Sequence, residues 1–246
     1  MKKNLLKAAV ITGILSAALT AHADDSKPLS ELLNGKFTGS VGGVSDYKFR
    51  GISQTSEAPA IQGNIDFVHN SGVKVGVWGS NVDFGGTSDA SLETDIYTSY
   101  THSFNKLTTE AGLIYFAYQG AKSINNYNYT EVYGSAGYDF GMVEVTASLN
   151  YSPDFFAASG VAYYPKFYIK APLPKGFAVD VSVGRQYIDN NSRYGVPDYT
   201  DWSVGVSYAI EDFTIKVQYV GTNLNNTQCA LDACEGKGLV SISKAF

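Results

Sequence analysis

The sequence is poor in the residues on which most catalytic and metal-binding sites depend. Its 246 residues include three histidines and two cysteines. Only His69 and His102 lie outside the first 23 residues, and the adjacent Ser71 and Ser103 have no third group placed to orient a base. No G-x-S-x-G motif occurs. We therefore expect neither catalysis nor a bound metal or cofactor.

Long apolar runs are also missing, apart from a short one near the N-terminus. Lys2, Lys3 and Lys7 precede an apolar stretch from Ala8 to Leu19, and Ala21-His22-Ala23 follows as an A-x-A-like cleavage site. The stretch is shorter than the ~20 residues of a spanning helix, which argues against the alternative of a membrane anchor. The absence of a cysteine after the cut argues against a lipoprotein. We expect residues 1–23 to be a signal peptide cleaved after Ala23, in an exported protein of a Gram-negative bacterium.

Basic residues are scarce in the remaining chain. Removing residues 1–23 removes three lysines and leaves 15 basic against 23 acidic residues, with no basic cluster. Affinity for nucleic acid comes from clustered Lys and Arg that neutralise phosphates. The composition therefore excludes a general nucleic-acid-binding protein.

The two cysteines, Cys229 and Cys234, are close together in the sequence. In an exported chain, such a pair usually forms a disulfide, whereas a metal site needs more ligands than this stretch contains. The sequence predicts a Cys229–Cys234 disulfide.

What the sequence has in abundance is alternation of apolar and polar residues. Between Tyr199 and Thr222, one face carries Trp202, Val204, Val206, Tyr208 and Ile210, and the other is polar or small. Glu211-Asp212 reverses the chain, and the alternation resumes from Phe213. Strand side chains alternate between faces. An apolar face ending in aromatic residues is typical of a membrane β-barrel hairpin, although a soluble sandwich also shows such alternation.

The unit repeats along the chain, and its connections alternate in length. Twelve strand-like segments are expected, at 37–50, 60–69, 73–82, 93–104, 107–118, 127–140, 143–152, 162–171, 177–187, 199–210, 213–222 and 238–246. The connections alternate strictly between long and short, as in outer-membrane barrels with short periplasmic turns and long extracellular loops. We therefore predict an all-β protein: a closed antiparallel transmembrane β-barrel of about 12 strands over residues 37–246. Residues 24–36 would form an N-terminal periplasmic segment, either with one helical turn at Pro28–Leu33 or without regular structure.

Two segments are ambiguous. In the segment 73–82, Trp78 falls on the face opposite the valines. The segment 107–118 is apolar on both faces, so Ile114 or Phe116 must point inward unless a bulge resets the register.

The stretch from Val44 to Thr55, VSDYKFRGISQT, is similar to a specific family. Further matching motifs follow in order: Ala60–Gly63, Ile65-Asp66, Trp78–Phe84, Glu93–Tyr97, Tyr129–Tyr133, Tyr199–Trp202 and Ser241–Phe246. Over nearly the whole chain after residue 23, the sequence resembles the TorF-like porin family of bacterial outer-membrane proteins of unknown function. The resemblance implies a β-barrel and a channel role, with no established substrate. The loop with Cys229 and Cys234 is a departure from the family pattern.

The C-terminal strand resembles the signal that the outer-membrane assembly machinery recognises. Val240, Ile242 and the terminal Phe246 fit its alternation, and Lys244 stands where an apolar or aromatic residue is usual. An ordinary last strand is the alternative.

If the apolar face is outward, the charged residues of the other face line the lumen. We expect the lumen and its constriction to involve Asp46, Lys48, Arg50, Glu93, Asp95, Glu131, Asp180 and Asp201. Other lumen charges would be Asp66, Lys166, Lys170 and Lys216, with Arg185 on the lipid side. Twelve strands lie between the filled eight-stranded barrels and the open barrels of 16–18 strands.

The sequence therefore predicts an outer-membrane porin for passive diffusion of small polar solutes through a narrow lumen. Its partners would be membrane lipids, the assembly machinery and the solutes. The alternatives are a closed structural barrel held by charge pairs, an outer-membrane enzyme of lipase or protease type, and a soluble periplasmic carrier. The sequence does not specify the solute, the ion preference or the oligomeric state.

Overall fold

The computed structural model describes residues 29–86, 88–225, 227–229 and 232–246, so the expected signal peptide lies outside the described residues. The chain divides into two compact units, residues 1–34 and 35–246. In the first unit, the described part contains helix α2 (Leu29–Leu32). The second unit is a β-barrel. None of the helices in the described ranges is both long and apolar enough to cross a membrane.

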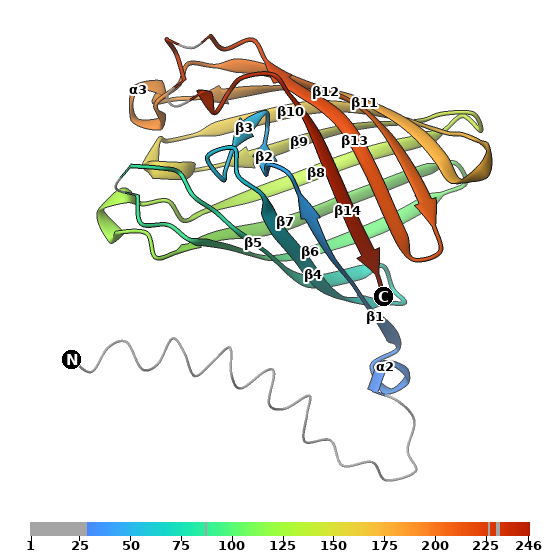
Figure 1. Cartoon of the computed structure of the whole chain (residues 1–246). Helices are drawn as coiled ribbons and strands as arrows, with labels where there is room; N and C mark the ends of the chain where they lie inside the picture. The colour runs from blue at the N-terminus through green and yellow to red at the C-terminus, as the bar shows by residue number, and fades with distance from the viewer. Residues whose placement is uncertain (1–28, 87, 226, 230–231) are drawn as a thin grey trace. The chain divides into compact units, whose positions relative to one another are not determined.

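The predicted closed, twelve-stranded antiparallel barrel is confirmed (Figure 1). Each strand pairs with its neighbours in sequence, and β1 closes the barrel by pairing with both β4 and β14. The strands are β1 (Gly35–Val44), β4 (Ala60–His69), β5 (Val73–Asn81), β6 (Leu92–Phe104), β7 (Leu107–Gln119), β8 (Tyr129–Asp139), β9 (Glu144–Ser152), β10 (Ala162–Pro172), β11 (Phe177–Ile188), β12 (Tyr199–Ile210), β13 (Phe213–Thr222) and β14 (Lys237–Ala245).

The C-terminus takes part in the closure. Ser40 of β1 lies opposite Ala245, and Val44 lies opposite Ser241. The backbone N–H of Phe246 donates to the carbonyl of Gly39, and the N–H of Gly39 donates back to Phe246 at 2.9 Å. Because every backbone edge is paired in this way, the barrel presents no free strand edge between β1 and β14.

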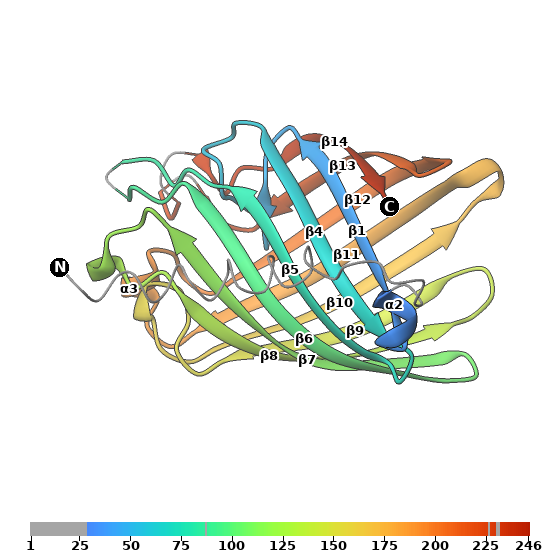
Figure 2. The same cartoon turned by 90° about the horizontal axis from the view of Figure 1, so that it is seen from below.

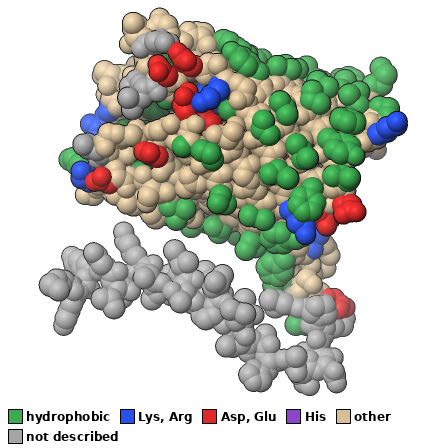
Figure 3. Space-filling view, viewed as in Figure 1, with side chains coloured by type: hydrophobic (Ala, Val, Ile, Leu, Met, Phe, Trp, Pro, Cys, Tyr) green, Lys and Arg blue, Asp and Glu red, His purple; other side chains and the backbone are tan. Residues whose placement is uncertain are grey.

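The barrel wall has an apolar exterior and a polar interior. On β12 and β13, Val204, Val206 and Val217 are exposed on the outside, while Asp201 and Ser203 point inward. Figure 3 shows hydrophobic side chains spread over the strands on one face, with charged side chains gathered toward the two ends of the barrel. The period-two alternation of each strand produces this division.

The two ends of the barrel differ in their connections (Figures 1 and 2). Long connections lie at one end, here called the loop end: 45–59, 82–91, 120–128, 153–161, 189–198 and 223–236. They include the short strands β2 (Lys48–Phe49) and β3 (Ile52–Ser53), helix α3 (Asn191–Tyr194) and 3-10 turns η1 (Ser123–Asn125) and η2 (Phe156–Ala158). Short connections lie at the other end, the turn end: 70–72, 105–106, 140–143, 173–176 with η3 (Pro174–Gly176), and 211–212.

The register resolves both ambiguous segments. Trp78 of β5 points inward and its ring lies 5.4 Å from the Tyr47 ring. On β7, Leu113 and Tyr115 are exposed on the outside and Phe116 is buried inside. The pairing of β7 with β6 and β8 is continuous, so no bulge is needed.

One strand expectation is wrong, and it concerns the candidate site. The alternation predicted a first strand over 37–50, but β1 runs from Gly35 to Val44. Beyond Val44, the N–H of Ser45 donates to the Val240 carbonyl, and the chain then leaves the wall. Asp46, Lys48 and Arg50 therefore reach the interior on a long connection and not on a barrel strand.

Candidate functional site

Residues 45–59, here called the plug segment, fold into the barrel at its loop end. Their side chains contact the wall on several sides. Tyr47 meets Trp78 of β5, and Phe49 meets Phe116 of β7 with ring centroids 5.9 Å apart. Arg50 reaches β8 and β11, described below. The segment thus crosses the lumen and narrows it.

The tip of the plug segment is a two-residue turn. β2 and β3 pair, with Phe49 opposite Ile52, and the turn between them is Arg50-Gly51. Both turn residues have positive φ, 48° and 82°, as a type I′ hairpin turn requires. A Cβ on Gly51 would collide with the Thr222 side chain, so glycine also permits the close approach to the wall.

Arg50 binds two strands of the wall, β8 and β11, which are separated by β9 and β10. Its guanidinium donates to both carboxylate oxygens of Glu131 at 2.7 Å and to Oε1 of Gln186 at 2.6 Å. Asn150 donates a further hydrogen bond to Glu131 at 2.9 Å. The guanidinium also lies over the Tyr164 ring, 4.2 Å from its centroid. Because both side chains of the pair are almost fully buried, the forked contact fixes the tip of the plug segment.

Lys48 and Asp46 fix the base of the same hairpin. Asp46 is fully buried and accepts hydrogen bonds from the hydroxyls of Ser53 and Thr55 at 2.6 and 3.1 Å. The Lys48 ammonium lies 4.0 Å from this carboxylate. Burial lowers the pKa of the Lys48 ammonium, and the charge of Asp46 opposes that change.

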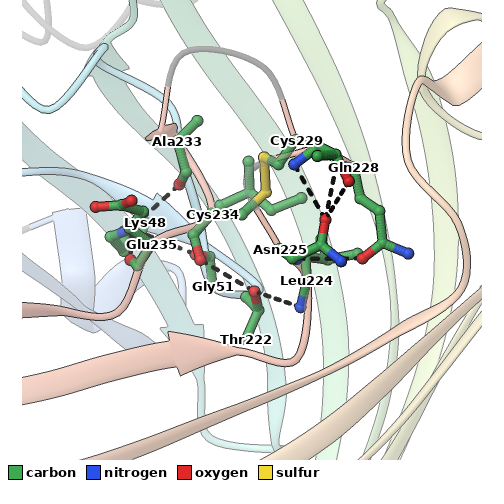
Figure 4. Close-up of a disulfide and its surroundings, with 12 residues drawn as sticks. Lys48, Gly51, Thr222, Leu224, Asn225, Gln228, Cys229, Ala233, Cys234 and Glu235 are labelled. Carbon is green, nitrogen blue, oxygen red and sulfur yellow. Dashed lines mark hydrogen bonds between the residues drawn. A yellow bond between two sulfur atoms is a disulfide. The ribbon is translucent and has the colours of Figure 1, made fainter.

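The loop that contains the disulfide contacts the base of the hairpin (Figure 4). Lys48 donates to the carbonyls of Ala233 and Glu235 at 3.1 and 2.8 Å. The N–H of Ser53 donates to the same Ala233 carbonyl at 2.8 Å. The predicted disulfide between Cys229 and Cys234 is confirmed, and both cysteines are buried. The bridge constrains the loop that supplies these acceptor carbonyls. We call this disulfide loop, with its contacts to Lys48 and Ser53, the clasp.

Acidic side chains face the plug segment from β6. Glu93 and Asp95 are 1% and 6% exposed. Tyr118 donates to Glu93 at 3.1 Å, and burial beside these two carboxyls raises the pKa of the Tyr47 hydroxyl. One oxygen of each carboxyl has no hydrogen-bond partner among the described residues.

A further group of lumen charges lies on β10 to β13. Lys216 pairs with Asp180 at 2.8 Å, and Tyr164 donates to both oxygens of Asp201 at 3.0 and 2.9 Å. Lys166 points into the same region without an ion pair among the described residues. This side of the lumen therefore combines ammonium groups with hydroxyl and carboxylate oxygens.

Three cavities follow one another along the barrel. A pocket of about 260 Å³ lies among the loop-end connections and includes Phe49 in its wall. A lumen cavity of about 390 Å³ is lined by Phe49, Arg50, Lys166 and Asp201, among others. A turn-end cavity of about 450 Å³ contains Lys170 and Glu144. Because Phe49 lines the first two, the plug segment separates them.

The structure brings most of the residues of the expected constriction into three groups. Arg50 pairs with Glu131, Asp46 lies beside Lys48, and Glu93 and Asp95 face Tyr47. Asp180 and Asp201 lie apart from these, on β11 and β12. The sequence did not single out Gln186, because nothing near it in the chain shows that the distant Arg50 needs its amide oxygen.

The two histidines of the barrel lie away from the plug segment. The His69 ring contacts the Ser71 hydroxyl at 2.8 Å within one exposed turn, and His102 packs against Phe104. Within the described part of the chain, no group of three or more His, Cys, Asp or Glu is arranged to hold a metal ion.

Comparison with known proteins gives a family and a fold. A family model described as "Bacterial protein of unknown function (Gcw_chp)" matches residues 34–246. No curated protein matches the sequence. Among solved structures, the KdgM porin is similar over 85% of this chain and 99% of its own, with a TM-score of 0.60 and 11% identity.

Two further structures have the same fold at similarly low identity. The NanC porin covers 85% of this chain and 98% of its own, with a TM-score of 0.57 and 10% identity. The COG4313 outer membrane channel from Pseudomonas putida F1 covers 90% and 97%, with a TM-score of 0.51 and 12% identity. These likenesses establish the barrel fold.

Proposed function

The chain belongs to the Gcw_chp family of bacterial proteins of unknown function, and we propose that it is an outer-membrane pore for the passive diffusion of small polar solutes. The observation that carries the proposal is the division of the wall into an apolar exterior and a charged interior. Exposed Val204 and Val217 would be costly in water over a whole cylinder, and inward charges such as Asp201 and Lys216 would be costly in lipid. A bilayer outside and water inside satisfy both.

The likeness to KdgM, NanC and the COG4313 channel supports this reading, since two of them are porins and the third is an outer membrane channel. The resemblance of the sequence motifs to those of TorF-like porins points the same way. The loop end would then face outward and the turn end the periplasm.

Export to the outer membrane is part of the proposal. Residues 1–23 would direct the chain across the inner membrane and be removed after Ala23, and residues 24–36 would remain in the periplasm. The pairing of Phe246 with Gly39 places the terminal aromatic at the closing seam, where the assembly machinery would recognise the last strand.

We assign the plug segment as the constriction. It separates the loop-end pocket from the lumen cavity, and Arg50 is held in place by Glu131 and Gln186. A solute would pass between the plug segment and the Lys166 side of the wall, where the lumen cavity lies. The competing hypothesis is a closed barrel, in which the contacts of Arg50 with Glu131 and Gln186 keep the lumen blocked.

Planar-bilayer recording with two proteins tests the proposal. The first is the full chain without its signal peptide, and the second has residues 48–54 replaced by Gly and Ser, which removes β2, β3 and Arg50. We expect small conductance steps from the first and steps several-fold larger from the second. A salt gradient then gives the ion preference from the reversal potential.

The two proteins separate the competing readings. Steps only from the plug variant would indicate a barrel that is closed at rest. No steps from either protein, at any voltage or salt concentration, would reject the pore. Equal steps from both would reject the plug segment as the constriction.

A further inference from the structure

The loop-end pocket is built by all six long connections. Phe49 comes from the plug segment, Phe84 from 82–91, Tyr127 from 120–128, Phe156 from 153–161 and Tyr194 from 189–198. Cys229 and Ala233 complete it from the clasp. Loops that differ in length and sequence thus contribute to a single concave site.

The lining of this pocket has an unusual composition for the mouth of a charged lumen. Eight of its 15 lining residues are aromatic, and none carries a charge. Three of its polar side chains already donate hydrogen bonds: Ser53 to Asp46 at 2.6 Å, Gln54 to the Ile52 carbonyl at 3.0 Å and Tyr118 to Glu93 at 3.1 Å. An ion that entered would lose its hydration without gaining a charged partner, so the pocket disfavours ions.

The rings form a floor and a rim. Phe155 and Tyr129 are buried at 2% and 4% exposure and form the floor. At the rim, half-buried Tyr127 and Phe156 are stacked with centroids 4.4 Å apart. Phe84 meets both rim rings edge-on, with interplanar angles of 86° and 90°.

The pocket has room for an additional aromatic ring. The cavity of about 260 Å³ is larger than the ~150 Å³ apolar cavity that accommodates benzene in a protein. Its walls offer both ring faces and ring edges, which are the surfaces that an additional aromatic ring prefers.

We propose that the loop-end pocket is a binding site for an uncharged aromatic solute of one or two rings. A saccharide fits less well, because most of the lining side chains are aromatic or aliphatic, and its many hydroxyls would lose hydration there in exchange for few hydrogen bonds. The inference does not depend on the pore: binding to the pocket is measured without any passage of solute.

Fluorine NMR with three small probes tests the site on the folded protein in detergent micelles. The probes are 4-fluorophenol, which is neutral at neutral pH, 4-fluorobenzoate, which is anionic, and 3-deoxy-3-fluoroglucose. Empty micelles provide the background for partitioning. We expect protein-dependent, saturable line broadening for 4-fluorophenol and none for the other two.

Two variants locate the binding. Tyr127→Ala removes a rim ring and should weaken 4-fluorophenol binding about tenfold. Val196→Trp fills the pocket from within its lining and should abolish binding, which keeps the test informative if the first variant folds poorly. Phe167→Ala is the matched control, because that ring is 58% exposed on the outer wall and its loss should change nothing.

The proposal is overturned if 4-fluorophenol behaves alike with protein and with empty micelles. It is also overturned if Val196→Trp binds as the unaltered protein does, or if the fluorinated sugar or the benzoate binds more tightly. The absence of conductance in the bilayer experiment would leave this site intact, so the two proposals fail separately.

Discussion

At the scale of single residues, Arg50 connects the plug segment to several parts of the interior. It has a positive φ of 48°, which is uncommon for a residue with a side chain, and so the turn stores some strain. Its contacts with Glu131, Gln186 and the Tyr164 ring offset that strain. Removing one partner of a buried ion pair leaves an uncompensated charge, which is why this pair is sensitive to single changes.

We predict that Arg50→Met lowers the free energy of unfolding by about 3–5 kcal/mol, since it leaves the Glu131 carboxylate buried and unpaired. Urea unfolding of the folded barrel measures the change. Lys122→Met is the control, because the Lys122–Asp89 pair is 56% exposed on both sides and should contribute at most about 1 kcal/mol. Equal losses in the two variants would contradict the role of Arg50.

Gly51→Ala should destabilise the barrel by more than about 1 kcal/mol, because alanine disfavours the φ of 82° and its Cβ would collide with Thr222. The same change at Gly141, which has a φ of 91° but open space around it, isolates the backbone effect. Comparable losses at both sites would show that contact with the wall adds nothing.

At the scale of elements, the plug segment and the clasp act together. The β2–β3 hairpin has only two residues in each strand, too few to be stable alone. Lys48 and Ser53 attach it to Ala233, and the disulfide restrains that loop. The position of the plug segment thus depends on a covalent bond in a different connection.

We therefore expect reduction of the disulfide by a dithiol to increase fluctuations of the single-channel current. Reduction exchanges the Cys229–Cys234 bond for two thiols and oxidises the dithiol, and the folded loop loses the stabilisation of about 2 kcal/mol that loop closure gives it relative to the unfolded chain. Recordings before and after addition of the dithiol measure this. The single-channel current of the double variant Cys229→Ser/Cys234→Ser should fluctuate before any dithiol is added and should not change on its addition. If the current of the double variant fluctuates no more than that of the oxidised protein, the clasp does not restrain the plug segment.

At the scale of the whole molecule, the division between exterior and interior determines the environment that the barrel can occupy. Neighbouring positions on one strand should respond to the same charge in opposite ways. Val217 of β13 is 56% exposed outside, while the adjacent Gln218 lines the lumen cavity.

In a bilayer, Val217→Arg should lower stability by about 2–4 kcal/mol, because a guanidinium near the midplane faces lipid. Gln218→Arg should change stability little and shift the reversal potential in a salt gradient toward anions. Unfolding in lipid vesicles and bilayer recording provide the two measurements. Similar losses for both variants would be inconsistent with a lipid-facing exterior.

The two-faced strands of the barrel and their antiparallel order are encoded in local sequence patterns, and those patterns predicted them. Alternation from Val143 to Asn150 or from Phe177 to Gln186 makes each strand two-faced, and the alternating connection lengths give the antiparallel order. The pairing of Cys229 with Cys234 follows from their separation of five positions. Strand ends shifted by a residue or two, because they depend on where a neighbouring strand stops.

The course of the chain after Val44 was decided only by the tertiary structure. The alternation of residues 45–50 suits a continued strand as well as a segment turned inward, so the sequence wrongly extended β1. The groups that stabilise the inward course are 81 positions away at Glu131, 136 away at Gln186 and 185 away at Ala233. A local pattern specifies which face a side chain takes, whereas the partners that draw a segment into the lumen meet it only after the barrel has closed.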